Sequence, residues 1–126
     1  MQGKLVPILI KIKNVYTFWY GIYGVVPRTH RYTLALKIDN LFVELIEMCA
    51  SASFVQKLDK VIYLKTAIRK LDTLKILLMV LWESKSIDNN KYEKLSVPLD
   101  EIGKMLGGWL GQVEKQNSPD KNLERN

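Results

Sequence analysis

The sequence contains one cysteine, Cys49, and one histidine, His30. A single cysteine excludes a disulfide framework and a cysteine-ligated zinc site within one chain. Cys49 falls inside an apolar helical pattern, which indicates a buried, unreactive thiol and a reducing, cytoplasmic environment. His30 stands between arginines in "PRTHRY", with no aspartate or glutamate within several residues to orient it. We therefore expect no catalytic base at this position.

Motifs for phosphate, metal and nucleophile chemistry are also missing. The sequence has no glycine-rich loop followed by lysine, no His-x-x-x-His and no Gly-x-Ser-x-Gly. The Glu-x-x-His pairs of a diiron bundle are absent, and Glu44 and Glu47 have no companion ligand. We interpret these two carboxylates as a solvated edge or as ion-pair partners. The sequence predicts a protein without catalytic activity, metal or organic cofactor.

No uncharged segment is long enough to cross a bilayer. The run "VYTFWYGIYGVVP" lies between Lys13 and Arg28 and falls short of the roughly 20 residues that a spanning helix needs. The N-terminal "MQGKLVPILIKIK" is interrupted by lysines, and no small-residue cleavage site follows it. We expect neither a membrane span nor an export signal.

Acidic residues are missing from the first 38 positions, which hold six basic ones, and the whole chain has a formal net charge of +6. A second basic stretch runs from Phe54 to Ile76. This asymmetry predicts a basic face that can meet a polyanion, with an ordinary solvated surface as the alternative. The candidate nucleic-acid contacts are Arg28, Arg31, Lys37, Lys57, Lys60, Lys65, Arg69 and Lys70. Arg69 lies one helical turn after Lys65, so both should reach phosphates from one side.

Apolar residues recur at alternating spacings of three and four, as on one face of a helix. The pattern predicts helices over about 7–25, 30–52, 55–84 and 88–115, with Pro7 in the first turn of the first helix. Thr29 and Asp88 are the expected caps of the second and fourth helices, and Pro98 should kink the fourth. With no strand pattern, residues 1–116 are expected to form an all-α, antiparallel up-down four-helix bundle. Residues 117–126 are polar and aperiodic, and we expect a disordered tail.

The segment "LDEIGKMLGGWL" contains three glycines, each of which costs a helix about 1 kcal/mol relative to alanine. Gly103, Gly107 and Gly111 form a narrow stripe beside the apolar seam, which would let another backbone approach closely. That neighbour is either another subunit or partner protein, or a helix of the same bundle. Asp100 in "DEIGK" should form intersubunit or interhelix ion pairs. Tyr16 and Tyr20 lie to one side of the first helix, where they should pack at a core or subunit contact or stack on bases.

Three segments make the chain similar to a known family: "VPRTHRYTLALKIDNLFVELIEM", "LDTLKILLMVLWESKSIDNNKYEKL" and "LDEIGKMLGGWL". Together with the four-helix pattern they resemble the Avd family, the accessory variability determinants of bacterial diversity-generating retroelements. The resemblance covers roughly residues 14 to 113. Its most specific parts are Pro27 and Arg31 at the entry to the second helix and the block from Asp100 to Trp109.

The resemblance implies a four-helix bundle that assembles into a homopentameric barrel with a basic surface and channel. It further implies binding to RNA, and to DNA copied from it, and association with the reverse transcriptase of the retroelement. That enzyme copies a template RNA with errors at adenine, and the cDNA enters a variable gene by mutagenic retrohoming. The family itself catalyses nothing. Similar bundles encoded without a reverse transcriptase resemble the proteins of 23S ribosomal RNA intervening sequences, so a stand-alone oligomeric scaffold for protein interactions is the alternative.

Overall fold

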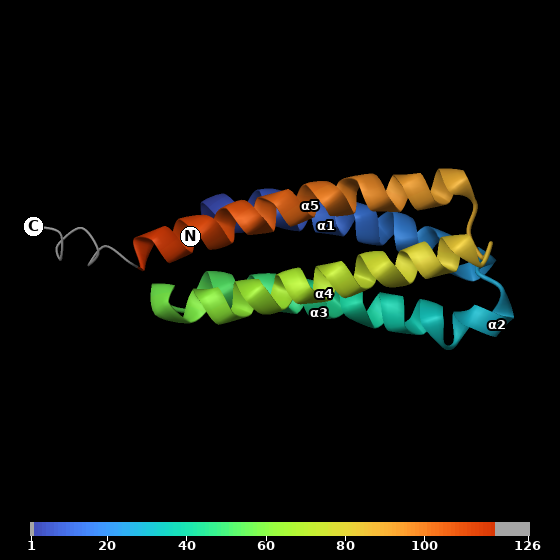
Figure 1. Cartoon of the computed structure of the whole chain (residues 1–126), viewed down its shortest axis with the longest axis horizontal. Coiled ribbons are helices and arrows are strands. Elements are labelled where there is room, and N and C mark those ends of the chain that lie inside the picture. The colour runs from blue at the N-terminus through green and yellow to red at the C-terminus, as the bar shows by residue number, and fades with distance from the viewer. Residues whose placement is uncertain (1, 118–126) are drawn as a thin grey trace, which may run out of the picture.

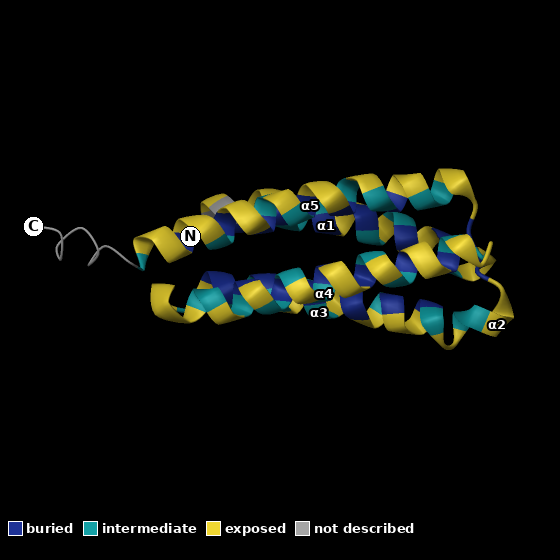
Figure 2. Cartoon of the chain, in the orientation of Figure 1, coloured by how far each residue is buried: buried dark blue, intermediate teal, exposed yellow. Residues whose placement is uncertain are grey.

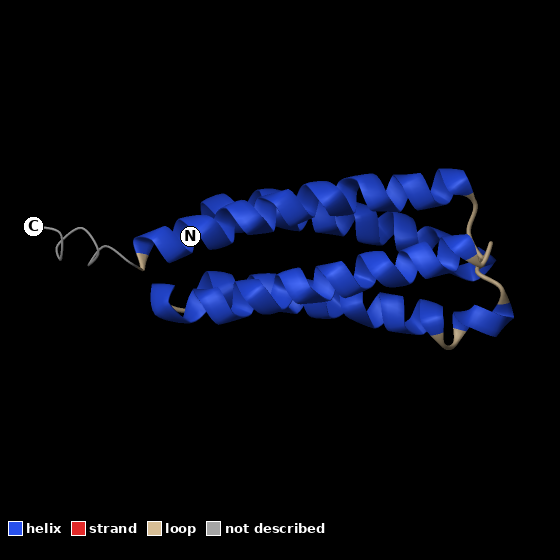
Figure 3. Cartoon of the chain, in the orientation of Figure 1, coloured by secondary structure: helices blue, strands red, loops and turns tan. Residues whose placement is uncertain are grey.

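Four long helices make up most of the structure, a computed structural model that describes residues 2–117. The described part contains no strand (Figure 3). The long helices are α1 (Gln2–Ile22), α3 (Leu34–Phe54), α4 (Lys57–Glu83) and α5 (Asn89–Gln116). A 3₁₀ turn, η1 (Tyr23–Val25), and a short helix, α2 (Arg28–Arg31), connect α1 to α3.

Each long helix packs against two others, so that α3 contacts α4, α4 contacts α5, and α1 contacts both α5 and α3. Figure 1 places α2 and the connection between α4 and α5 at one end of the bundle. The connection between α3 and α4 and the C-terminal end of α5 lie at the other end. The chain is therefore a helical bundle with its connections gathered at two ends.

The core is built from the apolar stripes of the four long helices, whose buried side faces inward (Figure 2). Seven apolar residues at alternating spacings of three and four mark the inner face of the first helix and its end, and all are buried: Leu5, Ile8, Ile12, Val15, Trp19, Ile22 and Val26. The rings of Trp19 and Phe42 are fully buried and stack with centroids 6.2 Å apart. Burial of a large apolar side chain contributes about 1.5–3 kcal/mol, so this stripe holds α1 on the bundle. None of the helices within 2–117 is long and apolar enough to cross a membrane.

The first helix begins at Gln2, earlier than the predicted start at Pro7, which lies inside α1. A proline at this position removes only the bond to the Gly3 carbonyl, in the first turn, where water can replace it. Likewise α5 continues through Pro98, which removes a bond to the carbonyl of Lys94, an exposed residue. Both prolines are tolerated because the carbonyls that they leave without a helical partner lie close to solvent.

The second predicted helix, 30–52, is divided into α2 and α3, and the expected cap at Thr29 is wrong. The residues that precede these helices are Pro27 and Thr33, and neither side chain makes a capping bond. Other groups hold the turn instead: the Tyr23 hydroxyl donates to the Arg31 carbonyl at 2.7 Å. These contacts bring together residues eight positions apart, which helical periodicity does not encode.

α1 ends at Ile22, three residues before the predicted 25, because the 3₁₀ turn η1 replaces its last turn. The end of α3 and both ends of α4 and α5 differ from prediction by one or two residues, as helix ends commonly do. Asp88 caps α5 as predicted, because its carboxylate accepts a hydrogen bond from the Lys91 backbone N–H at 2.8 Å. This bond lowers the pKa of Asp88. At the other end, Asn117 follows α5 and its side-chain amide donates to the Lys57 carbonyl at 2.9 Å. The rest of the predicted tail, 118–126, lies outside the described residues.

Candidate nucleic-acid interface

Lys65 and Arg69 lie one turn apart on α4, and both side chains are exposed. The Lys65 ammonium is 3.9 Å from a carboxylate oxygen of Glu114 on α5. Arg69 donates to the Thr66 hydroxyl at 3.5 Å. Exposed ion pairs contribute only about 0–1 kcal/mol, so neither contact prevents these cations from binding phosphate. The structure thus brings this predicted pair together on the solvent side of α4.

The other predicted cations of α4 are placed differently. The Lys60 ammonium donates to the Ala52 carbonyl at 2.6 Å, near the C-terminal end of α3. Lys70 forms an ion pair with Glu44 at 3.0 Å, between α4 and α3. Lys57 is exposed at the start of α4. Lys60 and Lys70 therefore join helices within the chain. The exposed candidate cations of α4 are Lys57 at its start and the pair Lys65 and Arg69 further along the helix.

Arg31 holds the turn between α1 and α3. Its guanidinium donates to the carbonyl of Gly24 at 2.9 Å and to that of Val26 at 3.0 and 3.2 Å. Arg28 and Lys37 are exposed, and within residues 2–117 their side chains form no hydrogen bond or ion pair. Because α2 and the start of α4 lie at opposite ends of the bundle (Figure 1), the eight predicted cations do not form one patch on a single chain.

Lys104 is a further exposed cation that the sequence analysis missed. It follows Gly103, and a methyl group at that glycine would lie 3.4 Å from the Leu71 side chain on α4. Lys104 therefore lies at about the same level of the bundle as Arg69. A helical wheel could have found it, because Lys104 shares the outer side of α5 with Gly107 and Gly111.

The glycine stripe is open to solvent along most of its length. Only Gly103 has a close neighbour, Leu71, whereas a methyl group at Gly107 or Gly111 would meet no other atom within 4 Å outside its own helix. Tight packing inside the same bundle therefore explains Gly103 and not the other two. Asp100, beside the stripe, pairs with Lys75 of α4 at 2.7 Å, so its ion pair in this chain is between helices.

Large apolar side chains flank the cations of α4 on its solvent side. Leu58 is 79% exposed and Ile62 is 67% exposed, before Lys65, and Ile76 and Val80 are exposed after Arg69. Large apolar side chains that are exposed together on one face of a folded chain commonly mark a protein contact. The α4 face therefore combines apolar ends with a cationic middle.

Tyr16 and Tyr20 of α1 and Tyr23 of η1 lie near Asp39 of α3. The Tyr16 hydroxyl donates to Asp39 Oδ1 at 2.9 Å, and its ring meets Phe42 edge-on with centroids 5.5 Å apart. Burial first, and then the hydrogen bond and negative charge of Asp39, raise the pKa of Tyr16. Tyr20, in contrast, is 71% exposed. Tyr16 thus packs within the chain, and Tyr20 is accessible to a partner.

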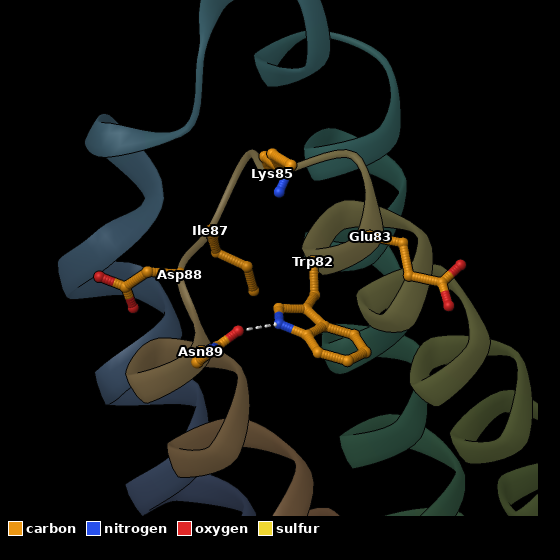
Figure 4. A pocket seen from close by; sticks show the side chains of 6 residues that line it. All are labelled: Trp82, Glu83, Lys85, Ile87, Asp88 and Asn89. Atoms are coloured by element: carbon orange, nitrogen blue, oxygen red, sulfur yellow. Dashed lines mark hydrogen bonds between the residues drawn. The ribbon is translucent and has the colours of Figure 1, made fainter.

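The turn between α4 and α5 contains a cavity of about 430 Å³ next to Trp82 (Figure 4). The Trp82 indole N–H donates to Asn89 Oδ1 at 2.7 Å, and its ring stacks on Tyr92 with centroids 4.5 Å apart.

The end of α4 is marked by Lys85, which has a positive φ of 66°. Its backbone N–H donates to the Trp82 carbonyl and that of Ser86 to the Leu81 carbonyl, which is the Schellman motif that usually ends with glycine.

The imidazole of His30 and the thiol of Cys49, which are types of group that act in catalysis elsewhere, have structural positions in this chain. His30 Nδ1 lies 2.7 Å from the Ser86 hydroxyl oxygen and so joins α2 to the α4–α5 turn. Cys49 is buried, and burial raises the pKa of its thiol to about 12. Among residues 2–117, no three His, Cys, Asp or Glu side chains gather closely enough to hold a metal ion.

A family model described as bAvd-like matches residues 7–113, a range that begins in α1 and ends in the last turn of α5. No curated protein and no solved structure matches the chain.

Proposed function

Because the chain belongs to the bAvd-like family, we propose that it is a non-catalytic accessory protein of a diversity-generating retroelement. In this function it binds the reverse transcriptase and the template RNA and cDNA in the cytoplasm and supports mutagenic retrohoming. The observation that carries the proposal is the family match, which takes in most of the bundle. The exposed cations of α4 and α5 supply the surface chemistry that RNA binding requires.

The proposed RNA face consists of Lys65, Arg69 and Lys104, which are exposed at neighbouring positions on two adjacent helices. Three cations on one chain give weak attraction to a polyanion. In a homopentamer the net charge of +6 would be repeated five times, to about +30, and the attraction would rise with it. Binding of this kind reads the shape and charge of the RNA more than its sequence.

The proposed assembly is a pentamer of antiparallel up-down bundles. The open glycines Gly107 and Gly111 of α5 support self-association. Glycines without a neighbour cost helix stability without a return, whereas glycines at a subunit contact allow close packing. By the same reasoning, a partner protein would cover these glycines as well as a second subunit would.

Charge reversal at Lys65 and Arg69 tests the RNA face. Each neutralised phosphate contributes about 0.7 to the slope of log affinity against log salt for a single strand. The double variant Lys65→Glu/Arg69→Glu should therefore lower that slope by roughly 1.4 for each chain in contact, with helix content unchanged by circular dichroism. The control Lys13→Glu/Lys115→Glu removes the same charge from exposed positions elsewhere and should weaken binding much less.

Equal RNA affinity in the wild-type protein and the Lys65/Arg69 variant would refute this assignment of the RNA face. A protein that assembles but binds RNA weakly, and has no reverse transcriptase gene beside its own, would instead match the stand-alone scaffold.

A further inference from the structure

Asp39 is the first acidic residue of the chain and lies on α3 opposite the tyrosines of α1. Its Oδ1 accepts two hydrogen bonds, from the Tyr16 hydroxyl at 2.9 Å and from the Trp19 indole N–H at 3.2 Å. The side chain is half-buried, yet no ion pair within residues 2–117 involves it. A partly desolvated carboxylate without a cation is costly, and here it is held in a fixed position by two neutral donors.

A cavity of about 370 Å³ opens beside this carboxylate and is lined by Tyr16, Tyr20, Tyr23, Gly24 and Asp39. The Tyr16 and Tyr20 rings are tilted by 34° with centroids 6.5 Å apart. Tyr23 is held in place by its bond to the Arg31 carbonyl and by an edge-on contact with Trp19. The cavity therefore has two fixed aromatic walls, one exposed aromatic wall and a carboxylate.

We propose that this cavity binds the cationic side chain, lysine or arginine, of a different protein. Aromatic faces attract organic cations within about 6 Å of the ring centroid. Asp39 Oδ2, which makes no hydrogen bond within the described residues, supplies the opposite charge. The combination of several tyrosines with one acidic group is the chemistry that recognises such cations.

A nucleobase or phosphate fits the cavity less well. The Asp39 carboxylate repels phosphate. A guanine edge presents two neighbouring donors and needs both carboxylate oxygens, but the two hydrogen bonds already made by Oδ1 use its acceptor capacity. One cation approaching Oδ2 meets neither obstacle.

The adjoining surface indicates that the occupant is a protein segment larger than one side chain. Along the same seam between α1 and α3, an apolar groove of about 490 Å³ shares Tyr16 with the cavity. Val6 and Ile10 are exposed in this groove, and Ile46 lines it from α3. A segment with a basic residue followed by large apolar side chains would fill both.

The assignment to a different protein rests on the proposed function. Lys57, Lys65 and Arg69 are the exposed cations that flank Leu58 and Ile62, the most exposed aliphatic residues in the described part of the chain, and Lys65 and Arg69 belong to the proposed RNA face. If they entered the Asp39 cavity of a second copy, they could not contact RNA. The cation-binding chemistry of the cavity itself does not depend on that function.

Titration of the ¹⁵N-labelled full chain with N-acetyl-arginine amide tests the cavity, with N-acetyl-norleucine amide as a neutral control. We expect the arginine probe, and not the norleucine probe, to shift the amide resonances of residues 16, 20, 23, 24 and 39. Tyr20→Ala should weaken binding about two- to fivefold. Tyr32→Ala, which removes a tyrosine that is 65% exposed elsewhere, should leave binding unchanged.

Asp39→Asn should abolish the arginine shifts. The asparagine keeps a side-chain oxygen that can accept hydrogen bonds from Tyr16 and Trp19, so the fold should be retained. If the Asp39→Asn variant does not fold, the Tyr20 and Tyr32 variants still test whether the cavity binds arginine. Equal shifts with both probes, shifts that persist in Asp39→Asn, or shifts at these residues with guanosine monophosphate instead of arginine would overturn the proposal. A smaller assembly mass for Asp39→Asn would assign the cation to a second copy and refute a different protein as its source. Failure to bind RNA or reverse transcriptase, with the arginine shifts intact, would refute the proposed function alone.

Discussion

Replacing Gly107 and Gly111 by alanine should stabilise the single chain and weaken its self-association. A methyl group at either position meets no other atom within 4 Å outside its own helix, so the substitution adds no clash within the chain. Alanine is favoured over glycine in a helix interior by about 1 kcal/mol. The double variant should therefore gain roughly 2 kcal/mol in the free energy of unfolding of the monomer. For a chain of this size that corresponds to roughly 8 °C in Tm.

The same methyl groups would disrupt a subunit contact made through the glycine stripe. Overpacking a close contact costs about 1–3 kcal/mol for each added group, which corresponds to a loss of well over tenfold in association for the pair. Urea unfolding at a concentration where the chain is monomeric would give the free energy of unfolding. Sedimentation velocity across a range of concentrations would give the strength of self-association.

Gly108→Ala and Gly103→Ala are the matched controls. Gly108 is also open but lies to one side of the stripe, so its alanine variant should gain stability without losing assembly. At Gly103 the new methyl would lie 3.4 Å from the Leu71 side chain, so the gain should be smaller. If the Gly107/Gly111 variant assembles as well as the wild-type protein, the stripe is not a subunit contact. If the monomer is destabilised, the structural reasoning about open space is wrong.

Three further predictions concern local features. Burial raises the pKa of Cys49 to about 12, so at pH 8 roughly one thiol in 10⁴ is ionised, against about a quarter for an ordinary cysteine. A thiol reagent should modify the native protein at least a thousandfold more slowly than the urea-unfolded protein, and comparable rates would contradict burial. Lys85→Gly should stabilise the chain by about 1 kcal/mol, because φ is positive at this position, and a loss of stability in urea unfolding would refute this. The lowered pKa of Asp88 means that its capping contribution is present above about pH 4 and is lost as the pH falls through its folded-state value. Asp88→Ala should thus lower Tm at pH 7 more than at pH 3, with Asp88→Asn retaining most of the cap, and an equal loss at both pH values would argue against a charged cap.

The features of the fold that follow from local spacing were predicted correctly from the sequence. The stripe from Leu5 to Val26 is buried as predicted because a repeat of three and four places those residues on one side of any helix. The cap at Asp88 depends only on a backbone N–H three residues later. The division between α2 and α3 could not be predicted in this way. It depends on hydrogen bonds from the side chains of Tyr23 and Arg31 to backbone carbonyls, and these groups come together only when the turn is folded.

The candidate site shows the same division between local and long-range information. One-turn spacing was enough to place Lys65 and Arg69 together. Spacing along the chain could not place Lys60 and Lys70, because their partners, the Ala52 carbonyl and Glu44, belong to α3. Which glycine of the stripe has a neighbour depended in the same way on the level at which α4 crosses α5. Helical periodicity predicts which side a residue faces, and packing decides what it meets there.

Co-purification of the full chain with the reverse transcriptase encoded beside it most directly tests the central claim, that the protein is an accessory of a retroelement. The two proteins should be expressed together, with one of them tagged, and treated with nuclease. Purification in about 1 M salt shortens the electrostatic range to about 3 Å and removes complexes bridged only by RNA. The proposed function predicts a stable complex that contains both proteins. If the chain assembles normally but the reverse transcriptase is absent from the purified material, the accessory function is contradicted and the stand-alone scaffold is favoured.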